Sequence, residues 1–234
     1  MALATSKKNR IASAGAGAVS INDISNRIAA VARDSVVTGG NVNILATSKP
    51  TVDSFSLGLA GSLTFGGGSG TSIGIAGAGS GSKNTIKNTI EATVSASPIK
   101  ASGALLVQAN DGSTIVADAG GVSAGLAIGQ TGIAIAAGAS ATINNISNTV
   151  SAQIDESTIE ADTIALLASS TGSIEALTVF GSVAAAGGKG IGVGIALAGA
   201  GSLNQVNNTV SAVVKNGSTL NSTGATTLDA ADST

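Results

Sequence analysis

The sequence predicts an all-β fold in which repeats of roughly 60 residues stack into a β-solenoid-like array. Three observations predict it: a recurring Asn motif, segments that alternate with a period of two, and a composition of small aliphatic residues. Only 10% of the 234 residues are charged, whereas 43% are hydrophobic, which is too many for a disordered chain. Aromatic residues make up 1% and glycine accounts for 33 residues, so Ile, Val, Leu and Ala must supply the core.

The recurring motif is an Asn followed by Thr or Arg and a β-branched residue, and it returns every 60 to 62 residues, at Asn26, Asn88, Asn148 and Asn208. A second Asn stands four residues before each, at Asn22, Asn84, Asn144 and Asn204. A Ser follows the motif at Ser35, Ser97 and Ser157, and in the fourth copy Gly217 takes its place before Ser218. Self-similarity at a fixed long period indicates a repeat architecture.

We therefore expect residues 1–234 to form a single array, with a shortened first repeat at 1–44, repeats at 45–106 and 107–166, and a partial fourth repeat at 167–234. The motif LATSK, found at 3–7 and at 45–49, suggests that the first repeat lacks part of a Gly/Ala-rich segment. With that alignment the chain begins and ends at equivalent points, near Ala4 and Ala230, as whole repeats from a longer array would.

The segment 148–161, NTVSAQIDESTIEA, has the alternation of a half-buried strand. It places Val150, Ala152 and Ile154 on one face and polar residues on the other, and Ser157 then breaks the pattern, which indicates a corner. Glycines and β-branched residues make a helix unfavourable here.

The Gly/Ala-rich segments also alternate. Ile191, Val193, Ile195 and Leu197 share one face, and Gly or Ala fills the other, so that a second sheet or coil can approach closely. Gly-rich turns precede this segment and its counterparts, at 66–70, 129–132 and 187–190. Strand, turn and strand predict a hairpin, an extra coil, or one wide coil with a tight corner, and the sequence does not separate these.

The uncharged stretch 119–139 is long enough to cross a membrane as a helix. It alternates, however, and its second face is small rather than polar, unlike the lumen side of a transmembrane strand. We expect packed strands, with membrane-inserting Gly/Ala β-hairpins of a toxin as an alternative.

Catalysis, cofactor binding and metal binding find little support, because the chain has no His and no Cys. The densest carboxylate group occurs in one repeat only, at Asp155, Glu156, Glu160 and Asp162. A polysaccharide-cleaving site is the sharpest interpretation of it, and a solvated charged strip is the one we favour. A net charge of −2 argues against a nucleic-acid partner, and the only basic run is expected in solvent, at Lys7, Lys8 and Arg10.

Parallel coils would bring the eight Asn residues into rows, where amides can hydrogen-bond from one coil to the next. Asn also caps turns, which is the alternative. We expect a structural Asn ladder rather than a ligand site, formed by Asn22, Asn26, Asn84, Asn88, Asn144, Asn148, Asn204 and Asn208.

Three stretches, at 88–109, 148–169 and 198–212, carry a resemblance that extends over essentially the whole chain. Their sequences resemble the repeats of large filamentous haemagglutinin-like and leukotoxin-type bacterial surface proteins. This resemblance implies a secreted or surface-displayed β-solenoid stalk of a giant adhesin. The period of 60 to 62 residues departs from it, because a simple coil of that fold is shorter.

We therefore expect a non-enzymatic structural module, a stiff stalk or spacer whose partners are neighbouring repeats of a longer chain. The alternative is a self-assembling fibre or extracellular matrix subunit, because open strand edges at both ends of an array would promote end-to-end pairing.

Overall fold

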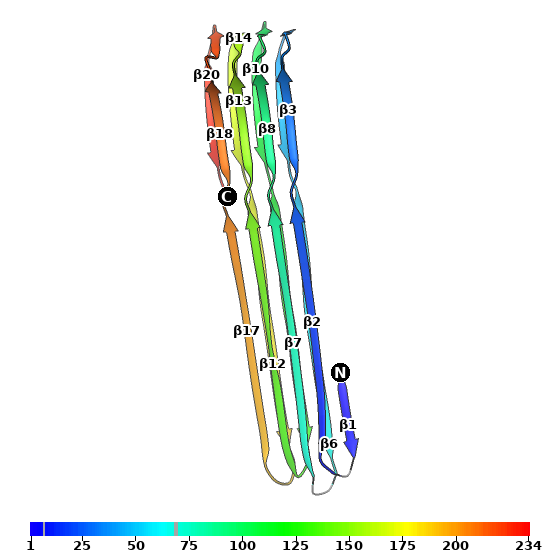
Figure 1. Ribbon diagram of the computed structural model, residues 1–234. Helices are drawn as coiled ribbons and strands as arrows, with labels where there is room; N and C mark the ends of the chain where they lie inside the picture. The colour runs from blue at the N-terminus through cyan, green and yellow to red at the C-terminus, as the bar shows by residue number, and fades with distance from the viewer. Residues whose placement is uncertain (7, 68–69) are drawn as a thin grey trace.

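The computed structural model describes residues 1–6, 8–67 and 70–234. These residues form twenty strands in five parallel sheets of four strands each, and none of them is helical (Figure 1). The expected all-β, solenoid-like stack is confirmed. No helix capable of crossing a membrane exists among the described residues. Lys7 and the central residues of the first Gly-rich turn, 68 and 69, lie outside this description.

Each sheet collects the equivalent strand of every repeat, and we name the sheets A to E in chain order. Sheet A contains β1 (Ala2–Ser6), β6 (Thr51–Gly66), β11 (Thr114–Ile128) and β16 (Ser173–Gly187). Sheet B contains β2 (Arg10–Ile24), β7 (Thr71–Ile86), β12 (Thr131–Ile146) and β17 (Gly192–Val206). Sheet C contains β3 (Arg27–Arg33), β8 (Thr89–Ser95), β13 (Thr149–Asp155) and β18 (Thr209–Lys215). Sheet D contains β4 (Val37–Gly39), β9 (Ile99–Ala101), β14 (Thr158–Ala161) and β19 (Thr219–Ser222). Sheet E contains β5 (Val42–Ser48), β10 (Ala104–Asp111), β15 (Thr163–Ser170) and β20 (Thr226–Asp232).

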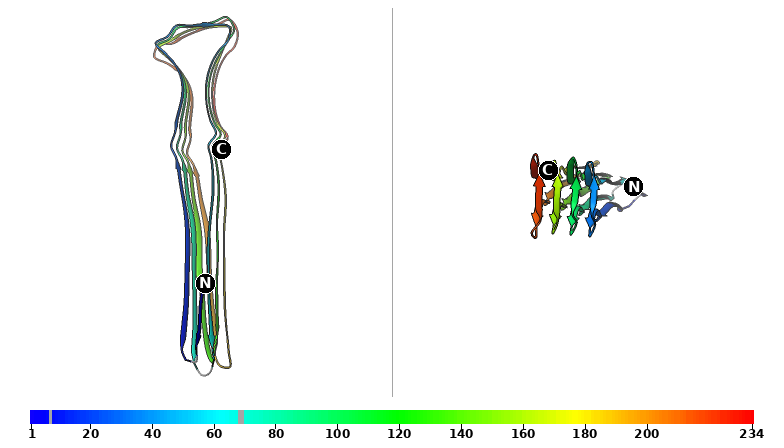
Figure 2. Two further views of the ribbon diagram at one scale, coloured as in Figure 1. Left: turned by 90° about the vertical axis from the view of Figure 1, so that its right-hand side faces the viewer. Right: turned by 90° about the horizontal axis from the view of Figure 1, so that it is seen from above.

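One repeat is one wide coil with a tight corner. The chain runs out along sheet A, turns at a Gly-rich tip, returns along sheet B and closes through sheets C, D and E (Figure 2). Hydrogen-bonded neighbours come from successive coils, as where Thr149 lies beside Thr89 on one side and Thr209 on the other. Because the two long strands of a coil belong to different sheets, the hairpin and the extra coil that the sequence left open are not formed.

The coil has two parts, which we call the blade and the head. The blade consists of sheets A and B, packed back to back, and the head is the wider end formed by sheets C, D and E. The head encloses the main aliphatic core, in which Val150, Ala152 and Ile154 are fully buried, as the alternation predicts. Identical or similar side chains stack there from coil to coil, for example Ile90 on Val150.

Inside the blade the two sheets meet through small side chains. Ala60, Ala76 and Ala78 are buried between them, and Gly58 lies so close to the backbone of Gly79 that a Cβ there would contact its carbonyl oxygen. The expected close approach across the Gly/Ala face is therefore present. Towards the tip, the large aliphatic residues of the blade consequently point outward on both of its faces. Nearer the head, Val52, Ile86, Ile115 and Ile146 are buried between the two sheets.

The alignment of the two LATSK motifs is wrong. Strand β1 pairs with the last five residues of β6, so Leu3 lies beside Leu63 in sheet A, whereas Leu45 lies in sheet E. The first coil has therefore not lost an internal Gly/Ala segment, and Ala4 and Ala230 are not equivalent positions. The short motif misled because Leu, Ala, Thr and Ser recur in several strands of every coil.

Arg10 differs from the expected solvated basic run. The period of two places it on the inward face of β2, in register with the buried Ser72. Its side chain is only 5% exposed, and its three guanidinium nitrogens have no hydrogen-bond partner among the described residues. Lys8 is exposed as expected.

Candidate functional site

The first set of Asn residues forms a side-chain ladder on the inward face of sheet B, where the blade joins the head. Asn22 Nδ2 donates to Asn84 Oδ1 over 2.8 Å, Asn84 to Asn144 over 2.8 Å, and Asn144 to Asn204 over 2.9 Å. Asn84 also donates across the blade to Ser54 Oγ of sheet A. Every amide thus points the same way along the stack, and the ladder ties the coils together as well as the two sheets.

The second set of Asn residues bonds to the backbone instead. Asn88 Oδ1 accepts the backbone N–H of Asn26 over 2.8 Å, and the same bond recurs from Asn88 to Asn148 and from Asn148 to Asn208. These residues lie in the bend between sheets B and C, where the strand ladder is interrupted and backbone donors need other partners. The sequence raised an amide ladder and turn capping as alternatives, and the structure contains both, one in each set.

A third row stands at the corner between sheets C and D. The backbone N–H of Ser97 donates to Ser157 Oγ over 3.1 Å, and Ser35 bonds Ser97 in the same manner. The residue before each Ser has a positive φ, at Asp34, Ala96 and Glu156. The fourth coil turns with Asn216 and an additional Gly217 at φ 72°, which is the physical basis of its one-residue slip.

A buried carboxylate at the end of sheet E is a feature that the sequence did not reveal. Asp111 is 3% exposed, and its oxygens accept hydrogen bonds from Ser113 Oγ over 2.7 Å, Asn148 Nδ2 over 2.9 Å and Ser170 Oγ over 3.3 Å. Side chains from three segments of the chain thus satisfy the buried carboxyl oxygens. Its neighbours in register are Ser48 and Ser170, so no repeated acidic row marked the position.

The equivalent site one coil earlier is incomplete. Asn88 Nδ2 is buried without a partner among the described residues, where Pro50 stands in place of Ser113 and Ser48 in place of Asp111. Asn148 Nδ2 bonds Ser113 Oγ over 2.8 Å, and proline offers no such hydroxyl.

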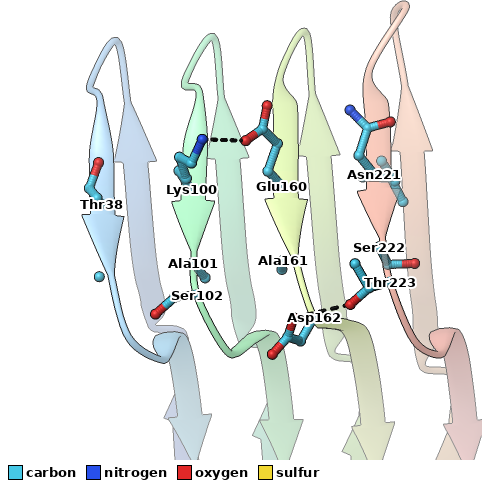
Figure 3. A pocket seen from close by; sticks show the side chains of 12 residues that line it. Thr38, Lys100, Ala101, Ser102, Glu160, Ala161, Asp162, Asn221, Ser222 and Thr223 are labelled. Atoms are coloured by element: carbon cyan, nitrogen blue, oxygen red, sulfur yellow. Dashed lines mark hydrogen bonds and ion pairs between the residues drawn. The ribbon is translucent and has the colours of Figure 1, made fainter.

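The four clustered carboxylates do not converge on a common point. Glu160 forms an exposed ion pair with Lys100 at 2.9 Å, and Asp162 accepts a hydrogen bond from Thr223 (Figure 3). Asp155 bonds the amide of Asn216 at 2.7 Å from a different sheet, while Glu156 occupies the corner with positive φ. Pairs of this kind, largely in solvent, add little to stability.

A concavity of about 830 Å³ lies along sheet D. Lys100, Glu160 and Asn221 come from successive strands and line it together with Asp162 and Thr223, as Figure 3 shows. Within the described part of the chain, no three His, Cys, Asp or Glu residues are placed to hold a metal ion. Both carboxylates that line the concavity, Glu160 and Asp162, are bonded to a residue of a neighbouring coil. We therefore interpret this surface as a set of bonds between coils.

The Asn residues where the blade joins the head and the Ser residues at the corner between sheets C and D thus form three rows of hydrogen bonds that run from coil to coil. Their chemistry is that of structural cross-links: neutral amides and hydroxyls, fixed in register and largely buried. No protein-family model matches the chain, and neither the curated proteins nor the solved structures compared with it contain a match.

Proposed function

We propose that the chain is a non-enzymatic structural module, a stiff β-solenoid segment that serves as stalk or spacer in a larger bacterial surface or secreted protein. The observation that supports it most is the register: each coil bonds the next through the strands of all five sheets and through the Asn and Ser rows. Bending the stack would have to break several of these rows together. The resemblance to haemagglutinin-like and leukotoxin-type repeats supports the surface location.

The geometry also bears on what such a module provides. Each coil uses 60 to 62 residues and adds only one strand spacing, about 4.8 Å, to the length of the stack. An extended stalk could be built from far fewer residues per ångström. The additional residues go into the wide blade, so the coil supplies lateral stiffness and flat surface more than reach.

A tandem protein tests this function directly. Thr234 follows Asp232, which continues the row of Ser170, Asp111 and Ser48, so joining a second copy of residues 51–234 after Thr234 keeps the register of sheet A. In repeat proteins, stability is the sum of unit and interface terms. We expect one cooperative thermal transition at a higher midpoint, an unchanged scattering cross-section, and about 14 Å of additional length from three new coils. Two separate transitions would contradict the proposal.

A second candidate function, end-to-end self-assembly, is favoured by the polarity of the ladders. The last coil presents Asn204 Nδ2 and the backbone N–H of Asn208 without partners among the described residues, and the first presents Asn22 Oδ1 and Asn26 Oδ1 as acceptors. Stacked copies would complete both rows. Imaging of the purified chain distinguishes the two functions, because strictly monomeric particles exclude the fibre.

A further inference from the structure

Both outer faces of the blade carry large aliphatic side chains in contact with solvent, and sheet A adds the aromatic rings of Phe55 and Phe65. On sheet A, Phe55, Leu57 and Leu59 are 69%, 44% and 59% exposed. On sheet B, Leu197 is 62% exposed. An apolar surface of this extent on a folded chain marks an interaction site, and the composition of the two faces identifies what fits them.

The two faces differ in where their large residues lie. In the second coil, the outer face of sheet A has a ridge of Phe55, Leu57 and Leu59, while the outer face of sheet B has a trough of Gly77, Gly79 and Gly81. Ridge and trough lie at the same level along the blade, because the inward residue Gly58 packs against the backbone of Gly79. A ridge on one side of the blade therefore stands directly behind a trough on the other.

The fourth coil repeats the relationship, with one reversal. Leu177 and Val179 of sheet A stand at the level of Gly199 and Gly201 of sheet B, a level fixed by Gly194, which packs against the carbonyl of Ala184. Where sheet B becomes large, at Leu197, sheet A becomes small, at Gly181. Large residues are thus matched by small ones in both directions along this part of the blade, whereas nearer the tip large residues stand at the same level on both faces, as Val183 and Ile195 do.

The charges of the two faces also differ near the head. Within the described strands, the outer face of sheet B carries Lys83, its only lysine or arginine, and one acidic residue, Asp23 of the first coil. The outer face of sheet A carries acidic residues near the head, Asp53, Asp118 and Glu175. Asp53 belongs to the same coil and the same level as Lys83, since the adjacent residues Ser54 and Asn84 are hydrogen-bonded across the blade.

We infer that the partner of the blade is a second copy of this chain, packed side by side so that sheet A of one blade lies on sheet B of the next. A simple translation along the blade normal sets Leu57 and Leu59 into the Gly77–Gly81 trough and brings Asp53 to Lys83. The contact is heterologous and does not close on itself, so copies add in an open row. This inference does not rest on the proposed stalk function.

The area is sufficient for a specific contact. A strand of 15 residues is about 50 Å long and three strands are about 15 Å wide, so each face offers roughly 700 Å² and a pair of faces would bury about 1,400 Å². That lies in the range of stable protein–protein interfaces. The tips carry no charged residue on either face from 57 to 66 or from 71 to 81, which keeps the centre of the contact free of unpaired charge.

The experiment compares the sedimentation of the purified chain over a range of concentrations with that of two face variants. Gly79→Arg fills the trough; a Cβ at this position meets only Ala139 O, at 3.8 Å, so the fold accommodates it. Leu57→Lys places a charge on the ridge. The matched control is Val31→Lys on the head, where the side chain is 47% exposed. We expect the parent chain and Val31→Lys to assemble at equal concentrations. The two face variants should require at least tenfold higher concentrations to assemble.

Exchanging the charges of Asp53 and Lys83 is a control for the possibility that a variant fails to assemble because it is misfolded. Lys83→Glu and Asp53→Lys should each weaken assembly by a few-fold, and the double variant should restore it, with thermal midpoints unchanged throughout. A parent chain that remains monomeric at every concentration overturns the inference. Assembly that survives all face variants also overturns it, because pairing then occurs at the strand edges of the first and last coils.

A lipid membrane is the other partner that could cover these apolar faces, and the same protein variants test for it. Flotation with neutral phosphatidylcholine vesicles should leave the parent chain in the protein fraction. If the chain floats with the vesicles, if Gly79→Arg and Leu57→Lys abolish flotation, and if no assembly occurs without lipid, the faces bind membrane and the inference is wrong.

Discussion

Asn84 Nδ2 donates to Asn144 Oδ1 over 2.8 Å, and both residues are buried although 60 residues separate them in the chain. Replacing Asn84 by Leu keeps the branched shape of the side chain but leaves Asn144 Oδ1 and Ser54 Oγ without their donor and Asn22 Nδ2 without its acceptor in the ladder. A buried polar group without a partner costs about 1 to 3 kcal/mol. We predict that Asn84→Leu lowers stability by about 3 kcal/mol, measured as a lower urea midpoint.

The control for the ladder is its open end. Asn204 is exposed and accepts from Asn144 without donating to a further coil. Asn204→Leu leaves Asn144 Nδ2 without its partner, at the open end of the stack, and should therefore cost about 1 kcal/mol, less than Asn84→Leu. Equal losses for the two variants would mean that the ladder contributes nothing beyond local packing.

The corner between sheets C and D holds a second prediction. Ala96 has φ 48°, a left-handed conformation that costs an L residue about 1 kcal/mol. Ala96→Gly should thus stabilise the chain by about that amount, raising the thermal midpoint. Asp34→Gly should gain less, since Asp tolerates this region at φ 49°.

Inside the blade, the glycines of sheet A set the spacing of the two sheets. A Cβ at Gly58 would lie 3.0 Å from the carbonyl carbon and 3.2 Å from the amide nitrogen of Gly79. Overpacking of this kind costs about 1 to 3 kcal/mol, so Gly58→Ala should lower the thermal midpoint. Gly77→Ala, whose Cβ would meet only Ala137 O at 4.0 Å, should leave it unchanged or slightly raised. Similar losses at both positions would show that the close approach of the two sheets does not determine the effect at Gly58.

The head core provides the most severe substitution. Val150 is fully buried between Ile90 and Val210. Val150→Asp buries a charge with no partner and should abolish the cooperative thermal transition, because such burial costs several kcal/mol. An unchanged midpoint would mean that the buried face has been assigned wrongly.

Much of this architecture could be predicted from the sequence, because stacking imposes the same constraints on every repeat. The Asn pairs revealed the period, and alternation around Val150 identified the buried face of sheet C. The Gly/Ala face of sheet B correctly indicated a close approach. The pairing of the strands in the blade could not be predicted, because a Gly-rich turn joins two long strands both in a hairpin and in a wide coil. The two arrangements differ in whether a strand pairs with the strand across the turn or with its equivalent 60 residues away, as it does here.

Residues that differ from the adjacent members of their row were the ones that the sequence did not reveal. Asp111 has no acidic counterpart in the neighbouring coils, and Phe180, which packs inward over Gly121 and Gly138, replaces a glycine of its own row. Arg10 was misjudged for the same reason, since Ser72 is its counterpart. The fold could be predicted from residues that repeat in every coil. The environment of a residue that differs from its neighbours in the row could not.

The central claim is that successive coils stack in parallel and in register, and one distance tests it most directly. Val31 and Val213 lie in the same row of sheet C, through Thr93 and Gln153, and both are exposed. Since the chain has no cysteine, nitroxide labels can be placed at these two positions alone. The structure predicts a separation of about 14 Å, three strand spacings, and hence strong dipolar broadening of the electron paramagnetic resonance spectrum. A spectrum without dipolar broadening would contradict the in-register solenoid.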